Sequence, residues 1–279
     1  PGEEEGDMVF AKQLASLAEV YVNDAFGTCH RAHASMTGRP QVLGGGYVGY
    51  LVERELDFLL GAVSDPRQPM TLVLGGAKVS DKVPVIENLL DRTKSVLIGG
   101  AMAFTFMRAG GMETGRSLVE ADRVPVAGAI MEKAAKAGVR LLLPVDIVVA
   151  PSPDEGGSAF TVEAGAIPPD MMGLDVGEAT VKLFDGVIST SGTVVWNGPM
   201  GLFEKKPFDR ATRAVAKSLA RATGRGAVTI VGGGDSARAV SEAGAAESVS
   251  FVSTGGGVSL ELLQGRQLPA LKALLGEGR

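Results

Sequence analysis

Residues 71–82 read TLVLGGAKVSDK, a short apolar run that meets two glycines and then a polar segment with helical spacing. Thr71–Leu74 form a short, mostly apolar run that is typical of a strand buried on both faces. Gly75 and Gly76 allow a tight turn and a close approach of the backbone to another group. The stretch therefore predicts a strand, a glycine turn and the start of a helix.

The same device recurs along the chain. Five further apolar runs end at glycine or at a polar turn, and continuous runs of this length favour the buried strands of a parallel sheet. These runs are 95–98, 139–143, 193–196, 227–231 and 249–252.

Helical patterns separate these runs. Val85, Ile86, Leu89 and Leu90 form one apolar stripe, and a second stripe runs from Ala127 to Ala134. Alternating strands and helices predict βαβ units with right-handed crossovers. We therefore expect an α/β fold with a doubly wound, Rossmann-like parallel sheet, although the pattern does not give the order of the strands.

The first 64 residues predict part of a second α/β lobe. A helix is expected over 9–20, a short strand over 21–24 and a loop at 44–46. A further helix over 50–60 precedes Asp65-Pro66, where the residue before proline avoids helical geometry. We place a domain boundary near 64–69, with this helix as the connector.

Composition excludes several function classes. The chain has 279 residues, 27 basic and 32 acidic side chains and a net charge of −5, so a broad basic surface for nucleic acid is not expected. No apolar run is long enough to span a membrane. One cysteine and two histidines argue against a disulfide framework and a zinc site, and indicate a reducing, cytoplasmic compartment.

Two glycine turns carry charged side chains that suit phosphate. Lys78 and Lys82 are four residues apart and can reach one ligand if the turn is already helical, or they can be two solvated lysines beside a tight turn. Gly232, Gly233 and Gly234 open another helix. Asp235 there can hold Mg²⁺ together with phosphate oxygens, or it can simply cap the helix.

A third glycine turn spans residues 253–257, and the three together indicate a nucleotide crevice at the carboxyl ends of the strands. Asn197 can bind phosphate or hold its own turn, and Glu204 can accept from ribose or lie on the surface. The segment 23–33 holds both histidines and Asp24; a His–Asp proton relay is conceivable there, but no serine or cysteine elbow accompanies it.

The motifs together resemble the phosphoglycerate kinase family, in the family's order and along the whole chain. The matching stretches are 22–28 (VNDAFGT), 30–33 (HRAH), 75–82 (GGAKVSDK), 99–103 (GGAMA), 172–175 (MGLD), 196–199 (WNGP), 232–235 (GGGD), 253–257 (STGGG) and 259–261 (SLE).

The resemblance implies a reaction and its residues. The family passes a phosphoryl group between 1,3-bisphosphoglycerate and ADP, giving 3-phosphoglycerate and ATP, with Mg²⁺. By resemblance, Lys78, Lys82, Gly233 and Gly234 serve the transfer, Asp235 the metal, and Arg31 and His30 the glycerate. Nucleotide contacts are implied for Gly75, Gly76, Ala77, Gly99, Gly100, Gly173, Leu174, Asn197, Glu204, Gly232, Asp235 and Ser236.

The resemblance also implies how the chain is organised. Residues 1–47 correspond to the end of a substrate lobe, 48–64 to the connector, 65–266 to the nucleotide lobe and 267–279 to a tail that packs on the first lobe. The chain starts after most of the family's substrate lobe, so we expect a monomeric fragment with little turnover. The alternatives are a nucleotide-binding module without catalysis and, less favoured because a Gly-x-Gly-x-x-Gly turn is missing, a dinucleotide oxidoreductase.

Overall fold

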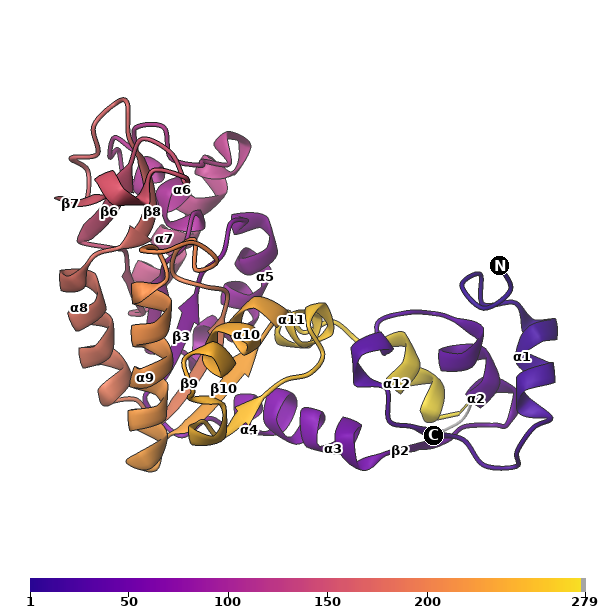
Figure 1. Ribbon diagram of the computed structural model, residues 1–279. Coiled ribbons are helices and arrows are strands. Elements are labelled where there is room, and N and C mark those ends of the chain that lie inside the picture. The colour runs from indigo at the N-terminus through magenta and orange to yellow at the C-terminus, as the bar shows by residue number, and fades with distance from the viewer. Residues whose placement is uncertain (277–279) are drawn as a thin grey trace. The chain divides into compact units, whose positions relative to one another are not determined.

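The computed structural model describes residues 1–276 and contains two compact units (Figure 1). One unit combines Pro1–Ser64 with Ser253–Arg279, and the other is Asp65–Val252. This division places residues 253–266 with the first unit, whereas the predicted nucleotide lobe extends to 266. Contacts alone assign no role to a unit, so the functional lobes stay a prediction. Residues 277–279 of the predicted tail lie outside the described residues.

The second unit is built on a six-stranded parallel sheet, as the alternating pattern predicts. The strands follow the order β11-β10-β9-β3-β4-β5, and neighbours pair in parallel throughout. Their bounds are β3 Met70–Leu74, β4 Ser95–Ile98, β5 Arg140–Leu142, β9 Thr193–Asn197, β10 Val228–Gly232 and β11 Phe251–Val252.

Helices follow the strands of this unit, so the fold is a doubly wound α/β sheet. The helices are α5 Val79–Leu89, α6 Met102–Ala109, α7 Val124–Lys136, α8 Glu178–Ser189, α9 Arg210–Gly224 and α10 Gly234–Glu242, with short turns η4 Leu90–Arg92, η5 Ala121–Arg123, η6 Gly156–Ser158 and η7 Ala246–Ser248. The chain winds outward from β3 to β5, then returns to β9 on the other side of β3. The point between β3 and β9 is the topological switch, where open α/β sheets bind ligands.

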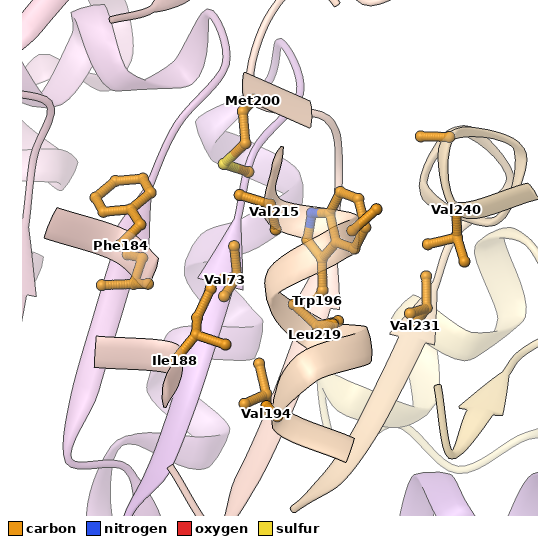
Figure 2. Packing of buried hydrophobic residues seen from close by; sticks show 14 of the residues in the cluster. Val73, Phe184, Ile188, Val194, Trp196, Met200, Val215, Leu219, Val231 and Val240 are labelled. Carbon is orange, nitrogen blue, oxygen red and sulfur yellow. The ribbon is translucent and has the colours of Figure 1, made fainter. Parts of the chain in front are cut away.

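Strand residues of one face pack on α8, α9 and α10 (Figure 2). Val194 and Trp196 are two residues apart on β9, so both point to the same face of the sheet. Trp196 is fully buried there in one cluster with Phe184 of α8 and Leu219 of α9. The neighbouring β9 residue Val195 is also fully buried, so the sheet is covered on both sides.

A second, antiparallel sheet was not predicted from the sequence. Its order is β7-β6-β8, with β6 Asp146–Ala150, β7 Phe160–Glu163 and β8 Met172–Val176. β6 and β8 each have three buried and two half-buried residues, whereas β7 is mostly exposed. They contain charged residues and glycine, and they therefore escape a search for continuous apolar runs.

The first unit contains short elements. They are α1 Met8–Ala15, β1 Val22–Asn23, η1 Phe26–Thr28, η2 Ala34–Gly38, α2 Arg39–Val42, β2 Tyr47–Val48, α3 Tyr50–Leu56, η3 Asp57–Gly61, α4 Ala62–Ser64, α11 Gly257–Leu263 and α12 Pro269–Leu274. The helix predicted over 9–20 ends at Ala15, so the prediction was too long. Leu17 and Val20 are exposed, which shows that their apolar spacing does not correspond to a packed face.

The connector helix predicted over 50–60 is an α-helix that continues as a π-helix. Asp24 caps its N-terminus, because one carboxylate oxygen accepts from the backbone N–H groups of Leu51 at 2.7 Å and Val52 at 3.1 Å. Asp24 is therefore a helix cap. This structural role accounts for the carboxylate without the conceivable proton relay.

Candidate functional site

A pocket of about 450 Å³ lies in the second unit where β3, β4 and β9 end, and the whole of β8 lines it. Seven predicted nucleotide residues line it: Gly76, Ala77, Gly100, Gly173, Leu174, Glu204 and Asp235. Its remaining lining residues are Ala101, Phe104, Leu118, Pro153, Met172, Asp175, Val176, Pro199, Met200, Gly201 and Leu202. The lining is mostly apolar with a few polar groups at its rim, a composition typical of small-molecule sites.

The glycine turns that form the floor of this pocket pack against one another. The N–H of Gly75 donates to Asn197 O at 3.0 Å, and the N–H of Gly100 donates to Met200 O at 2.8 Å. A Cβ on Gly75 would lie 2.1 Å from Pro199 O, and one on Gly100 would lie 2.4 Å from Gly76 N. Backbone packing alone therefore requires these glycines. Gly99 is confined by a side chain instead, since a Cβ there would lie 2.5 Å from Met200 Sδ and 3.3 Å from Met200 Cα.

Lys82 joins three of the predicted site residues in one hydrogen-bonded chain. Its amine donates to Asn197 Oδ1, and Asn197 Nδ2 donates to Gly232 O at 2.8 Å. Lys82 is only 9% exposed, and burial lowers the pKa of its amine while Asp81 and Asp235 oppose that shift. The structure thus brings a buried cation from α5 to the ends of β9 and β10.

The N-terminus of α10 lies beside this chain. Gly233 has a φ of +92°, which only glycine adopts without strain, and Gly234 is the first residue of the helix. Asp235 is exposed in the first turn. Ser236 is fully buried and its Oγ accepts from Gly198 N at 2.6 Å, so this hydroxyl holds the β9 turn.

The turn after β3 presents Lys78 differently from Lys82. Lys78 occupies the N-cap position of α5 with an exposed side chain, next to the exposed Ala77. The two lysines therefore differ in environment, one amine in solvent and one nearly buried. This difference was not predictable from their spacing.

Sequence reasoning missed the apolar side of the pocket. Phe104 of α6 covers Gly173 so closely that a Cβ on Gly173 would lie 2.2 Å from Phe104 Cζ. Met200 and Asp175 also line the pocket. No sequence signal marks Phe104, because it looks like an ordinary core residue on a helix stripe. Asp175 stood in a quoted motif but had no role assigned to it.

The residues present can accommodate a nucleotide-bound magnesium ion but no protein-only metal cage. Among the described residues, no group of three or more histidine, cysteine, aspartate or glutamate side chains is placed to share a metal. Mg²⁺ commonly takes one or two carboxylates and completes its shell with phosphate oxygens and water. The exposed Asp235 at the pocket rim suits that mode.

The predicted glycerate residues lie in the first unit. Arg31 is exposed, and His30 follows the η1 turn. His30 Nδ1 is buried and has no hydrogen-bond partner within residues 1–276. Cys29 is fully buried, and burial raises the pKa of its thiol to about 11, which disfavours a reactive thiolate.

The third glycine turn, 253–257, belongs to the first unit and is occupied by the chain itself. Glu55 of α3 is 1% exposed, and it accepts from Ser253 Oγ, Thr254 N and Thr254 Oγ1, each at 2.7 Å. A buried carboxylate fills the polar groups at the start of this turn. The pocket described above is lined by residues of the first two glycine turns and by none of residues 253–257.

The sequence model that describes phosphoglycerate kinase matches residues 1–266 of this chain. The chain belongs to the phosphoglycerate kinase family. A relative named phosphoglycerate kinase from Synechococcus sp. (strain JA-2-3B'a(2-13)) is 53% identical over 274 residues, which are 98% of this chain and 66% of the relative. Phosphoglycerate kinase 3, cytosolic, from Arabidopsis thaliana is 50% identical over 98% of this chain and 68% of its own length.

Solved structures agree with this family assignment. The structure of phosphoglycerate kinase from Coxiella burnetii superposes on this chain with a TM-score of 0.92 at 39% sequence identity. The match covers 98% of this chain and 70% of the Coxiella burnetii chain. The chain spans about two thirds of the length of these relatives. As for membranes, no helix within residues 1–276 combines the length and apolar character that crossing one requires.

Proposed function

We propose that this protein serves reversible phosphoryl transfer from 1,3-bisphosphoglycerate to ADP, giving 3-phosphoglycerate and ATP. The observation that carries the proposal is the chain from Lys82 through Asn197 to Gly232, placed beside the N-terminus of α10 and the pocket at the switch point. A cation and a helix N-terminus at one place favour a phosphate.

Different residues would contact the base, the ribose and the phosphates of the nucleotide. Phe104, Gly173 and Leu174 form an apolar wall for the base, with Glu204 at the rim for ribose hydroxyls. The backbone of Gly233 and Gly234 faces the phosphates, and Lys78 and Lys82 offset the charge of the moving phosphoryl group. Phosphoryl transfer depends on such positioning and charge stabilisation more than on a covalent nucleophile.

Asp235 would hold Mg²⁺, which neutralises part of the charge on the nucleotide phosphates when it is bound. Asn197 keeps the Lys82 amine at the strand ends, because its amide accepts from Lys82 and donates to Gly232 O. Low solvent exposure at Lys82 strengthens its interaction with a phosphate, since charges act more strongly in a medium of low dielectric constant.

The remaining assignments are also proposals. Arg31 and His30 would contact the glycerate, and the protein would act as a cytoplasmic monomer on small molecules and not on nucleic acid. The cytosolic relatives from Arabidopsis thaliana and Triticum aestivum support the compartment. The mildly acidic net charge of −5 supports the absence of a nucleic-acid partner.

Calorimetric titration of the 279-residue chain with MgADP tests the nucleotide site. We expect saturable binding that Asp235→Ala weakens at least about tenfold, because the metal-bound phosphates lose their carboxylate partner. Glu247→Ala, which removes an exposed carboxylate near the same helix, is the matched control. Equal affinities for both variants would refute the assignment of Asp235.

The catalytic part of the proposal requires a separate measurement. Phosphoryl transfer from ATP to 3-phosphoglycerate is followed by ³¹P NMR with the chain and with Lys82→Met. Little turnover is expected from this chain, so the low rate of the unmodified chain is the reference. A kinase loses this transfer far more than MgADP binding in the variant, whereas a nucleotide-binding module without catalysis shows no transfer in either form. Lys94→Met, at an exposed lysine of the same unit, controls for loss of charge alone.

A further inference from the structure

The segment Ser117–Glu120, just before η5, contacts both sides of the pocket. Ser117 Oγ accepts from the N–H of Gly173 on β8 at 2.8 Å, and Leu118 lines the pocket between. Glu120 reaches α5, where one carboxylate oxygen accepts from the N–H of Val79. Residues 117–120 therefore connect β8, which lines the pocket, with the start of α5 beside Lys78 and Lys82.

Glu120 acts as the N-cap that α5 does not carry in its own sequence. The residue at the cap position is Lys78, whose side chain has no acceptor and makes no capping bond within the described residues. Glu120 Oε2 takes the N–H of Val79, and Ser80 Oγ lies 3.4 Å from Glu120 Oε1. A carboxylate at a helix N-terminus is favourable for both hydrogen bonding and the helix dipole.

The position of Glu120 is itself fixed by a neighbouring helix. Its backbone N–H donates to Thr105 Oγ1 at 3.0 Å, and Thr105 is 1% exposed on α6. The backbone that carries the capping carboxylate is thus anchored by a buried hydroxyl of a packed helix.

The first turn of α5 needs this external support. Pro84 lies inside the helix and has no N–H, so the carbonyl of Ser80 loses the bond that residue 84 would normally donate. Lys82 lies in this weakened turn, and its amine reaches Asn197 only if the turn keeps its orientation. The first turn of α5 is therefore held by two contacts, the Glu120 cap on Val79 and the bond of the Lys82 amine to Asn197.

We propose that Glu120 is a positioning residue that acts through Lys82. It holds the first turn of α5 so that the Lys82 amine lies at the strand ends, where we propose that phosphates bind. This inference rests on the function proposed above for Lys78 and Lys82. Glu120 does not line the pocket formed by the described residues, so it acts on the ligand only through the turn that it caps.

The first experiment measures the position of Lys82 without any nucleotide. An amine-selective acylating reagent modifies lysines according to their exposure, and peptide mass spectrometry gives the rate at each site. We expect Glu120→Ala to accelerate modification of Lys82 at least about threefold, because the capping bond, worth a factor of several, no longer holds the turn. The rate at Lys94 is the internal control for global unfolding. Glu113→Ala is the matched variant, since Glu113 lies in the same loop and pairs with exposed Arg108 at 2.9 Å.

The second experiment is a double-mutant cycle on MgADP affinity. Glu120→Ala should weaken binding about five- to tenfold, the effect of one charge-assisted hydrogen bond. In a Lys82→Met background the same change should have little further effect, because the cap acts through that amine. Glu120→Gln should retain part of the affinity, since its amide oxygen still accepts from Val79.

The outcomes separate the two proposals. An equal loss of affinity in both backgrounds, or an unchanged rate at Lys82 in Glu120→Ala, overturns the positioning role. If the unmodified chain binds no MgADP, the nucleotide function is refuted, and the labelling rates alone then decide whether Glu120 positions Lys82.

Discussion

Asp175 should make the stability of the second unit depend on pH in an unusual direction. Its carboxyl is 3% exposed, and its oxygens accept from Val176 N at 2.9 Å and Ala211 N at 3.1 Å. Burial raises the pKa of Asp175 to about 8, the backbone hydrogen bonds oppose the shift, and the charge of Asp209 adds to it. The perturbation is Asp175→Asn, which removes titration and keeps the shape.

The sign follows from which state holds the proton. Above its ordinary pKa of 3.8 the carboxyl is ionised in the unfolded chain, whereas the folded chain keeps it protonated up to about pH 8. The folded state binds more protons in this window. The stability that the Asp175 carboxyl contributes is therefore fully present below pH 3.8 and is lost as the pH rises toward 8. One such group changes the unfolding free energy by about 1.4 kcal/mol per pH unit, or roughly 2–3 kcal/mol between pH 5 and 7.

Urea unfolding at pH 5, 6, 7 and 8, followed by tryptophan fluorescence, measures this effect in the second structural unit, where Asp175 lies. Trp196 is the single tryptophan, and it is fully buried in the second unit. We expect the unmodified chain to be more stable than Asp175→Asn at pH 5, with a gap that shrinks by about 2–3 kcal/mol by pH 7. Asp91→Asn, at an exposed site of the same unit, should show a constant gap. A constant gap for Asp175→Asn as well would refute the reasoning.

Three further changes test the packing. Phe184→Ala should cost about 3–5 kcal/mol in urea unfolding, because it empties a fully buried site, and a cost below 1 kcal/mol would mean that the cluster of Figure 2 collapses around the gap. Gly75→Ala should abolish MgADP binding, because its methyl would lie 2.1 Å from Pro199 O; Gly186→Ala, where nothing lies within 4 Å, should bind normally. Glu55→Gln should destabilise the first unit by about 1–3 kcal/mol in thermal unfolding, since an amide nitrogen cannot accept the bonds it replaces. An unchanged melting temperature for that variant would contradict the buried role of Glu55.

Much of the sheet was predictable because its strands are buried on both faces. Residues 95–98 and 193–196 read as continuous apolar runs, and the structure confirms them as β4 and, with one more residue, β9. The strands of the antiparallel sheet were not predictable by the same rule. Met172–Val176 contains glycine and aspartate and is only half-buried at Met172 and Leu174, so no continuous apolar run separates it from a loop. Strand order depends on contacts between distant segments, which periodicity does not record.

The residues of the candidate site were largely predictable, but the hydrogen bonds between them were not. The glycines and Lys82 stand out in the sequence, yet their mutual contacts come from the fold: Lys82 and Asn197 are 115 residues apart. Glu120 had no signal, since it caps a helix that begins 41 residues earlier. Motifs whose contacts lie within a few residues, such as a turn and its own cap, can be recognised in a sequence. Contacts between residues that are far apart in the sequence cannot.

The glycine floor of the pocket limits how this site can change. Peptide groups of the turns at Gly75, Gly100 and Gly198 touch one another, and no side chain larger than hydrogen fits between them. Point substitution therefore cannot reshape the floor. An altered preference for the base would have to come from the side chains that surround it, chiefly Phe104 and Leu202. For an engineer, the reprogrammable part of this site is its wall.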